Sequence, residues 1–329
     1  MRTEVASVNV SRSVESASAS IVTLTMNPAL DASTSVPYVL PDQKLRCGPP
    51  RYEPGGGGIN VARAVTRLGG DALACFPVGG PAGDLLMRLL AREGVRHHAV
   101  PVAGWTRENV NVLEDVSGRQ FRFCMPGHTL APAEWAGFLD MVTGLSPAPQ
   151  FLVASGSLPP GVPVDFYARL AAVANAREIR LVLDTSGEPL AAAVERGVFL
   201  LKPSLREFQA LTGGREYDDV SLAQAAGHAV ERGWCKVLVL SLGASGAFWA
   251  DASGRERLAA PAVTVKSSVG AGDSLVAGIV FSLAEKRAIG EAVRFGVAAG
   301  AASVMNPGTE LCHREDVERL YPQVLVSPA

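Results

Sequence analysis

A short loop of small residues, Gly270-Ala271-Gly272, stands directly before Asp273 and a long apolar segment. The apolar residues have helical spacing, so the sequence predicts a helix that opens at this loop. A helix N-terminus presents unpaired N–H groups and a partial positive charge, which suits a phosphate group in transfer. A carboxylate in the same turn could remove a proton from a hydroxyl group while the amides hold the developing negative charge. Asp273 could equally cap the helix, so the loop by itself leaves its role open.

A second glycine-rich loop, Gly55-Gly56-Gly57-Gly58, precedes a predicted helix over 59–68 that ends at Gly69-Gly70. The dinucleotide-binding pattern G-x-G-x-x-G requires glycine where Asn60 stands, and no G-K-[ST] follows, which excludes a Walker loop. Two interpretations remain. The run is either a plain tight turn or a loop that lets the backbone approach a polar ligand, which Asn60 would hydrogen-bond.

Short apolar runs at 151–154, 180–183, 198–201 and 236–240 are typical of strands buried in a parallel sheet. Such sheets bind ligands beyond the carboxyl ends of their strands. Polar or glycine residues follow these runs and the first predicted strand at 21–26, namely Asp31, Gly156-Ser157, Asp184, Lys202 and Ser241. We therefore expect these residues to meet at one edge of the sheet.

The remaining predicted elements continue the alternation of strand and helix, with a strand at 72–78 and helices at 83–93, 274–286 and 289–304. This alternation predicts an α/β fold, a mostly parallel sheet with helices on both faces. No repeat or linker divides the chain, so residues 21–329 are expected to form a single domain.

Two segments do not fit the alternation. One is the chain that follows Asp31, and the other is a pair of alternating runs at 109–114 and 119–124, typical of a hairpin turning at 115–118. Together they predict a small β-sheet lid, built from about 33–53 and 105–125.

Two strand ends carry patterns with an ordinary structural interpretation. After Lys202-Pro203, Ser204 as N-cap and Glu207 three residues later form a helix-capping pattern. The segment 241–246, which includes Gly243 and Gly246, suits either a hairpin turn or a loop that binds a nucleotide phosphate.

Charged residues that could recognise a sugar phosphate also have two interpretations. Asp31, just beyond the end of the first strand, would either accept sugar hydroxyls or merely form an Asx turn. Four cations are either solvated surface charges or, in part, a phosphate anchor: Lys44, Arg46, Arg63 and Arg107.

Composition restricts the class of protein. The 329 residues are 48% hydrophobic and 19% charged, with a net charge of −2 and no basic block, which argues against nucleic-acid binding. No apolar run is long enough to span a membrane. Five cysteines without a C-x-x-C pair indicate free thiols, and five scattered histidines argue against a structural transition-metal site. The Ser-rich residues 1–20 lack the apolar core of a signal peptide and predict a flexible extension, so a cytoplasmic location is expected.

Taken together and in this order, the stretches resemble the ribokinase-type carbohydrate kinase family. The family's late signature is similar to the segment Val269 to Ser274, and its early signature is similar to the segment Gly55 to Ala62. The similarity runs from about Ile21 to the C-terminus.

Within this family the chain is most similar to the bacterial 6-phosphofructokinases of the second type. The similar stretches are Lys44-Leu45-Arg46-Cys47, Trp105-Thr106-Arg107, Phe123-Cys124-Met125-Pro126-Gly127 and Gly156-Ser157-Leu158-Pro159-Pro160-Gly161. Related 1-phosphofructokinases and tagatose-6-phosphate kinases usually carry lysine at the third position of the glycine run, where this chain has Gly57.

The resemblance implies a ribokinase-like three-layer α/β/α fold and transfer of the γ-phosphate of ATP, with Mg²⁺, to the 1-hydroxyl of fructose 6-phosphate. Asp273 would be the general base, and the amides of Gly270, Ala271 and Gly272 would form the anion hole. A homodimer paired through the β lid is also implied.

The resemblance also implies the binding residues. The sugar phosphate would contact Asp31, Lys44, Gly56, Gly57, Gly58, Asn60, Arg107 and Ser157. ATP would contact Lys44, Lys202, Ser204, Ser241, Gly243, Gly246, Val297 and Ala301. Glu207 would hold Mg²⁺ through water, and a K⁺ site would form from Ser267, Val269, Ser303, Asn306, Gly308 and Glu310.

One residue departs from the family pattern, because Ser204 stands where the metal-linked Asn-x-x-Glu motif has asparagine. We expect altered Mg²⁺ dependence rather than loss of activity. The alternatives are a 1-phosphofructokinase or a tagatose-6-phosphate kinase, and more remotely a non-catalytic sensor of sugar phosphates or nucleotides. A nicotinamide-dependent oxidoreductase is disfavoured by the missing glycine fingerprint.

Overall fold

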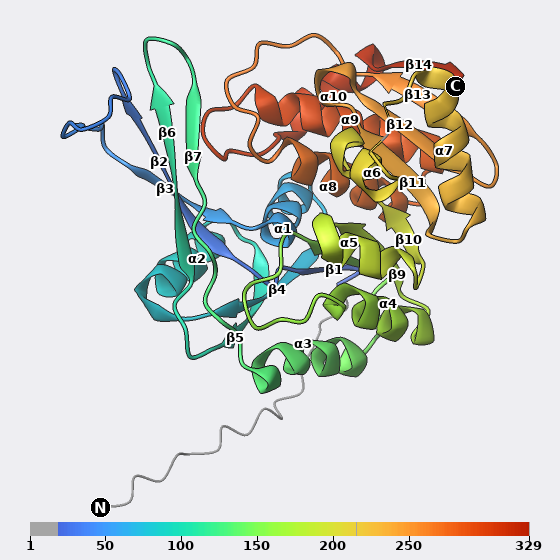
Figure 1. The fold of residues 1–329 in the computed structure, drawn as a ribbon, viewed down its shortest axis with the longest axis horizontal. Helices are drawn as coiled ribbons and strands as arrows, with labels where there is room; N and C mark the ends of the chain where they lie inside the picture. Colours follow the sequence, from blue (N-terminus) through green and yellow to red (C-terminus); the bar gives the residue numbers. More distant parts are fainter. Residues whose placement is uncertain (1–18, 215, 329) are drawn as a thin grey trace, which may run out of the picture.

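The computed structural model of the chain describes residues 19–214 and 216–328, which form a large and a small β-sheet with helices around the large one (Figure 1). The predicted N-terminal extension therefore lies outside the described residues, except for Ala19 and Ser20.

The large sheet has ten strands in the order β14-β13-β12-β11-β10-β9-β8-β1-β4-β5. Neighbours from β5 to β11 pair in parallel, and β12, β13 and β14 add an antiparallel edge. The strands are β1 (Ile21–Leu24), β4 (Ala72–Val78), β5 (Arg96–Pro101), β8 (Phe151–Ser155), β9 (Arg180–Asp184), β10 (Val198–Leu201), β11 (Cys235–Ser241), β12 (Ala247–Asp251), β13 (Arg255–Ala259) and β14 (Leu325–Pro328). The prediction of a mostly parallel sheet is confirmed.

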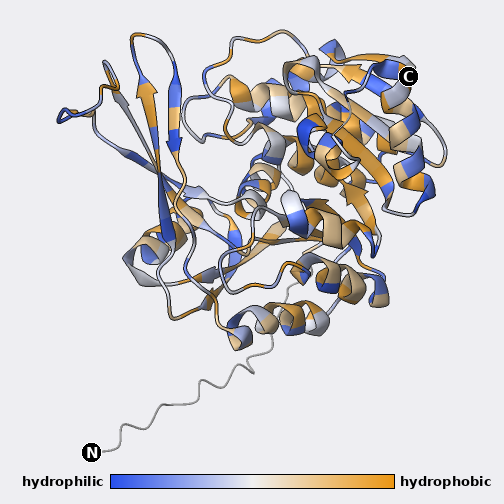
Figure 2. Cartoon of the chain, viewed as in Figure 1, coloured by the Kyte–Doolittle hydropathy of each residue, from blue (hydrophilic) through white to orange (hydrophobic). Residues whose placement is uncertain are grey.

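Two apolar cores lie on opposite faces of this sheet, because successive strand residues point to opposite sides. In β8, Phe151 and Val153 join one core while Leu152 and Ala154 join the other. The first core contains α1 (Gly57–Arg67), α2 (Gly80–Arg92), α8 (Ala271–Ala284), α9 (Ile289–Val304) and α10 (Arg314–Leu320). The second contains α3 (Pro132–Gly144), α4 (Phe166–Ala176), α5 (Gly187–Val194), α6 (Leu205–Leu211) and α7 (Asp219–Glu231). The three-layer α/β/α prediction is confirmed, and Figure 2 shows the central strands in hydrophobic colours.

The small sheet has the order β3-β2-β6-β7 and stands beside the three layers (Figure 1). Its strands are β2 (Ala29–Val36), β3 (Arg51–Gly55), β6 (Arg107–Glu114) and β7 (Gln120–Phe123). The predicted hairpin is present as the antiparallel pair β6 and β7. Asp31 lies beyond the end of β1, as predicted, but the alternative of an Asx turn was wrong, since Asp31 lies inside β2 and pairs with Glu53 and Asn109. That strand has few large apolar residues, and it is held by strands that follow it much later in the chain.

The chain changes direction across the large sheet at β1, which lies between β4 on one side and β8 on the other. In an open parallel sheet, ligands bind at such a switch point. The small sheet starts close by, because β2 begins five residues after β1 ends. The fold therefore brings the carboxyl ends of β1, β8, β9 and β10 together with the base of the small sheet.

Helix α8 begins at Ala271 rather than at the predicted Ser274. Gly270 is its N-cap and has a left-handed backbone with φ of 78°, which glycine adopts without the strain that a side chain would add. This conformation turns the chain sharply into the helix, so Ala271, Gly272 and Asp273 form the first turn.

The position of α8 relative to α9 is fixed by close packing of the two helices. A Cβ atom on Gly278 would lie 2.8 Å from the Cα of Gly296 and 3.0 Å from the Cβ of Ala299. Both helices are apolar through most of their length, yet in the described part of the chain no helix combines the length and the apolarity that a membrane crossing needs.

We expect Gly278→Ala to lower the free energy of unfolding by about 1–3 kcal/mol, because the added methyl group overpacks a rigid contact. Gly227→Ala in α7 is the matched control, since an added Cβ there would meet nothing within 4 Å, and it should be neutral or stabilise by about 0.5–1 kcal/mol. Urea unfolding followed by circular dichroism measures both. Equal stability of Gly278→Ala and the wild type would contradict this account of the packing.

Candidate active site

The N-terminus of α8 opens toward the carboxyl edge of the large sheet. The amide of Ser274 donates to the Gly270 carbonyl at 2.8 Å and starts the helical hydrogen-bond pattern. The amides of Ala271, Gly272 and Asp273 precede it, so they have no acceptor within the helix. Lys202 reaches this turn, because a Cβ on Gly272 would lie 3.6 Å from its Nζ. Amide dipoles and an ammonium group thus converge on one point that suits an anion.

Asp273 lies in this first turn, partly buried, and accepts a hydrogen bond of 2.9 Å from Nδ2 of Asn60. Burial and the negative charge of Asp184 raise its pKa to about 6, while the Asn60 hydrogen bond and the Lys202 charge act in the opposite direction. The carboxyl group is therefore poised to change its protonation state just below neutral pH, as a general base should be.

Lys202 and Asp184 form an ion pair of 3.1 Å beside Asp273, with the Lys202 side chain only 6% exposed. Burial alone would lower the pKa of Lys202, but the negative charge of Asp184 outweighs this effect and raises it, so the ammonium stays charged. Burial raises the pKa of Asp184. In the sequence, Asp184 is only a polar residue at a strand end, and no motif gives it a role.

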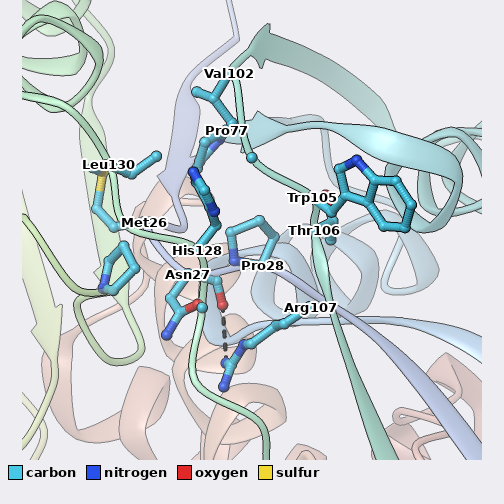
Figure 3. Close-up of a pocket in the computed structure, with 13 residues that line it drawn as sticks. Met26, Asn27, Pro28, Pro77, Val102, Trp105, Thr106, Arg107, His128 and Leu130 are labelled. Carbon is cyan, nitrogen blue, oxygen red and sulfur yellow. Dashed lines mark hydrogen bonds between the residues drawn. The ribbon is translucent and has the colours of Figure 1, made fainter.

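A cluster of polar side chains lies at the base of the small sheet. Asp31 is buried and accepts a 2.8 Å hydrogen bond from Asn109 on β6, and burial raises its pKa. Arg107 donates to the carbonyls of Met125 and Asn27 at 2.9 and 3.0 Å, as Figure 3 shows for Asn27. Its Nε is buried and has no hydrogen-bond partner among the described residues.

Two cavities share this cluster. The smaller one, drawn in Figure 3, is lined by Arg107, Asn27 and Thr106 among others. The larger has a volume of about 610 Å³ and is lined by Asn27, Arg107 and Ser157 together with apolar residues. Asn27 links Ser157 and Arg107, two residues predicted to bind the sugar phosphate. Its Nδ2 donates to Ser157 Oγ at 3.1 Å, and its carbonyl accepts from Arg107. In the sequence, Asn27 only marks the end of a strand, so its role in this cluster could not be predicted.

The glycine run packs against the ends of two strands of the large sheet. Gly56 has φ of 108° and precedes α1, which begins at Gly57. A Cβ on Gly57 would lie 2.9 Å from the carbonyl carbon of Ser155, so no side chain fits there without a shift of the backbone. Hence the run is both a tight turn and a close approach of the backbone to the strand ends.

Ser204 and Glu207 form the predicted capping box at the start of α6. Ser204 Oγ accepts from the Glu207 amide at 3.2 Å, and Glu207 Oε2 accepts from the Ser204 amide at 2.7 Å. Ser204 also bridges to Ser241 at the end of β11. The segment after Ser241 is a hairpin turn into β12, with a short 3₁₀ helix, η1 (Gly243–Ser245), and Gly246 at φ of 95°.

The six residues of the expected K⁺ site lie in the loop before α8, in the last turn of α9, which carries Ser303, and in the loop after α9. Ser267 Oγ donates to the Gly308 carbonyl at 2.6 Å and accepts from the Val269 amide at 3.2 Å. Ser303 Oγ is buried without a partner in the described part of the chain. Asn306 donates to a loop carbonyl, and Glu310 pairs with His313.

The second loop is also tied to the small sheet. Glu53 on β3 is buried, and its Oε2 accepts from the amide of Thr309 at 3.1 Å and from the Thr309 hydroxyl at 2.7 Å. Arg51, two residues before it, lies 3.3 Å from Glu310. These contacts join strand β3 to the loop that follows α9.

Several predicted residues lie apart from these clusters. Lys44 and Arg46 are in the exposed segment between β2 and β3 and have no ion pair in the described part of the chain. Val297 and Ala301 lie in α9, at 3% and 7% exposure, among the apolar residues of the first core. Arg63 is neither a surface charge nor a phosphate anchor, because it is fully buried and paired with Glu93.

No cluster of three or more His, Cys, Asp or Glu side chains in residues 19–214 and 216–328 could hold a metal ion by itself. A metal at this site would therefore be held mainly by water and phosphate oxygens, as Mg²⁺ commonly is. Glu207 fits such a role, since its capping bond uses only one of its two oxygens.

The three-layer fold, with a partly buried carboxylate at a helix N-terminus and strand ends lined by polar groups, is that of the ribokinase-like kinases. The pattern of the pfkB family carbohydrate kinases matches residues 19–316. The chain belongs to this family, whose members are phosphotransferases that act on an alcohol group.

ATP-dependent 6-phosphofructokinase isozyme 2 of Mycobacterium tuberculosis is 46% identical over 301 residues, which cover 92% of this chain and 88% of that protein. Phosphofructokinase-2 from Escherichia coli has been solved in complex with potassium and with fructose-6-phosphate, at TM-scores of 0.88 and 0.87 and identities of 43% and 41%. Each alignment covers 92% of this chain and 98% of the other. The 1-phosphofructokinase of Escherichia coli is more distant, at 29% identity over 310 residues, which cover 94% of this chain and 98% of that protein.

We expect Lys202→Met to destabilise the fold by about 3 kcal/mol at pH 8, because Asp184 is left as a largely buried charge without a partner. The loss should be smaller at pH 5. A carboxyl whose pKa is raised in the folded state binds a proton more tightly there than in the unfolded chain, so stability falls as pH rises above the ordinary value of 3.8.

Urea unfolding at pH 5 and pH 8 measures this difference. The double variant Asp184→Asn/Lys202→Met is the control, and it should recover stability and lose most of the added pH dependence. An equal loss for Lys202→Met at both pH values would argue against the ion pair as its cause.

Proposed function

We propose that this carbohydrate kinase transfers the γ-phosphoryl group of ATP to the 1-hydroxyl of fructose 6-phosphate and yields fructose 1,6-bisphosphate and ADP, the 6-phosphofructokinase step of glycolysis. The observation that carries the proposal is the site at α8, where a carboxyl with a pKa of about 6 adjoins unpaired amides and the Lys202 ammonium. The 46% identity to a 6-phosphofructokinase supports the choice of substrate, against 34% and 29% to two 1-phosphofructokinases.

Asp273 acts as the general base in this proposal. Its carboxylate takes the proton of the 1-hydroxyl as the hydroxyl oxygen bonds to the γ-phosphorus, and the bond from that phosphorus to the bridging oxygen of ADP breaks. Negative charge on the transferring group is stabilised by Lys202 and by the amides of Gly270, Ala271 and Gly272, of which the last two are in the first turn of α8 and have no acceptor within the helix. Phosphoryl transfer demands mainly positioning and charge stabilisation from the protein, which this arrangement supplies.

The sugar phosphate would bind at the base of the small sheet. Asp31 and Asn60 would accept and donate hydrogen bonds to sugar hydroxyls, beside the backbone of Gly56, Gly57 and Gly58 and the hydroxyl of Ser157. Arg107 would anchor the 6-phosphate, which is supported by its unpartnered Nε and its place in the 610 Å³ cavity. Lys44 would join from the exposed segment before β3.

The crowding at Gly57 favours 6-phosphofructokinase over the two alternatives, 1-phosphofructokinase and tagatose-6-phosphate kinase. A lysine side chain at this position, usual in those relatives, would meet Ser155 on the present backbone.

ATP would bind across the ends of β10 and β11. Its contacts would be Lys44, Lys202, Ser204, Ser241, Gly243, Gly246, Val297 and Ala301. A divalent metal is needed with ATP, and we propose Mg²⁺, held by phosphate oxygens and by water on Glu207. The proposed monovalent cation is K⁺, bound by Ser267, Val269, Ser303, Asn306, Gly308 and Glu310. The buried, unpartnered Ser303 Oγ supports that site, as does the potassium complex of the Escherichia coli relative.

We further propose that the small sheet closes over the sugar as a lid and pairs two subunits. Exposed large apolar residues of the sheet and of the connection after β2, which include Leu113, Phe123 and Tyr38 at 37%, 49% and 53% exposure, support such an interface. Sedimentation velocity measures whether two subunits pair, and a monomer at micromolar concentration would contradict the proposed dimer. The five free cysteines are consistent with work in the reducing cytoplasm.

The proposed function is tested by release of ADP from ATP with fructose 6-phosphate, fructose 1-phosphate or tagatose 6-phosphate as acceptor. The highest kcat/KM should be with fructose 6-phosphate. Absence of ADP release with all three would leave a non-catalytic sensor, and a preference for fructose 1-phosphate would make the chain a 1-phosphofructokinase.

Asp273→Asn should fold and bind both substrates but lower kcat by about 10²–10⁴, the usual contribution of a positioned base. In the wild type, kcat should fall about tenfold per pH unit below pH 6, because protonation removes the base. The variant should not show this fall. Near-wild-type kcat in Asp273→Asn would falsify its assignment as the base.

Arg107→Ala should raise the KM for fructose 6-phosphate by about 10- to 100-fold, since a charge-assisted phosphate contact contributes roughly 1.5–3 kcal/mol. The KM for ATP should change little. Arg119→Ala, at the exposed turn of the β6–β7 hairpin, is a control for loss of a small-sheet arginine. If both Michaelis constants rose equally in Arg107→Ala, the anchor would lie elsewhere.

A further inference from the structure

The proposed chemistry does not use Arg63, although among the described residues it has the largest side chain that is fully buried. Its Nε and Nη2 donate to the two carboxylate oxygens of Glu93 at 2.9 and 2.7 Å, and Nη1 donates to the Pro54 carbonyl at 2.8 Å. The same Nη1 lies 3.2 Å from Oδ1 of Asn60, which accepts a hydrogen bond from it. A buried guanidinium with this many partners can occupy only one orientation.

This arrangement determines which end of the Asn60 amide faces the site. A guanidinium can only donate hydrogen bonds, so the amide oxygen must turn toward Arg63. The NH₂ group then points the other way, and its Nδ2 lies 2.9 Å from Oδ2 of Asp273. In the opposite orientation, the amide oxygen would face the Asp273 carboxylate, and the two acceptors would repel each other.

We infer that Arg63 is a positioning residue, which, braced by Glu93, fixes the Asn60 amide so that its N–H groups orient the Asp273 carboxylate for proton removal. The inference rests on the proposed role of Asp273 as the base. The chain of contacts runs from the end of α2 through α1 to the first turn of α8, so three helices must keep their relative positions for the base to be aligned.

The charges in this chain support a fixed arrangement. Although burial raises the pKa of Glu93, the hydrogen bonds and charge of Arg63, with help from Arg67, lower it overall. Glu93 therefore remains an anion at neutral pH and holds Arg63 in place. The Pro54 carbonyl lies on β3, which adds the base of the small sheet to the same network.

Loss of the aligned amide should also change the ionisation of the base. The Asn60 hydrogen bond lowers the pKa of Asp273, against burial and the charges of Asp184 and Asp31, which raise it. Lys202 also faces Asp273 and lowers its pKa. The charge of Arg63 also lowers the pKa of Asp31 on β2. Arg63→Lys keeps this charge, so a shift in that variant reports on the Asn60 amide.

The test compares Arg63→Lys with Arg177→Lys, a matched control. Arg177 donates to the carbonyls of Val142 and Leu145 at 2.7 and 2.6 Å, at the outer end of α3. A lysine at position 63 keeps the charge but cannot hold Glu93, Pro54 and Asn60 at once. We expect Arg63→Lys to lower kcat by about 10- to 100-fold, with little change in the KM for ATP.

The pH profile separates positioning from a merely structural effect. The acid limb of the profile is the pH range in which kcat falls because the base is protonated. In Arg63→Lys it should move upward by about 0.5–1 pH unit, because the pKa of Asp273 rises when the Asn60 hydrogen bond is lost. Arg177→Lys should lose stability and keep the wild-type limb. Fructose 6-phosphate itself ionises near pH 6, but this contribution is the same for all variants and cancels in the comparison.

If Arg63→Lys does not fold, Glu93→Gln takes its place, because it removes the charge that braces Arg63 and should shift the limb in the same direction. The effect of either change on kcat should disappear in the Asp273→Asn background. An acid limb that stays at the wild-type pH in both variants overturns the inference while leaving Asp273 as the base. Full activity of Asp273→Asn, by contrast, overturns the proposed role of Asp273 and with it the base that Arg63 would position.

Discussion

The site depends on one ammonium group that offsets several negative charges. Lys202 lies 3.1 Å from Asp184, and the charges of Glu207 and Asp273 also raise its pKa. Without this cation, carboxylates from β9, α6 and α8 would repel one another at the edge of the sheet where the N-terminus of α8 opens. With it, Asp273 keeps a pKa of about 6 rather than a still higher one, and can act as a base at neutral pH.

Most of the large sheet could be predicted from the sequence because its strands are continuous apolar runs and its helices have regular spacing. The strand at Ala72–Val78 and the helix at Ile289–Val304 have the predicted bounds. In the small sheet, the β6–β7 hairpin could be predicted from its alternating polarity, but β2 and β3 could not be predicted as strands, because partners distant in the sequence hold them. Asp31 pairs with Asn109, 78 residues away, so no local signal placed it inside a strand.

The candidate site could be predicted as a set of strand-end residues but not as a network. Asn27 and Asn109 fix predicted residues in place, yet an asparagine near a strand end is ordinary in sequence. Arg63 was grouped with surface cations because its partner Glu93 is 30 residues further along the chain. The capping box could be predicted from the sequence, since its two residues, Ser204 and Glu207, lie within one helical turn.

The contact of Glu53 with Thr309 has a mechanical consequence for the small sheet. Strand β3 is fixed at this point to the loop after α9, and immediately beyond it the chain enters α1 through the glycine run. The small sheet is therefore attached to the large domain core close to its base, and it is not connected there by a flexible segment alone. The outer end of the sheet consists of the β6–β7 hairpin and the 37–50 connection. A displacement of this end would be transmitted through β3 to the loop that carries Gly308 and Glu310.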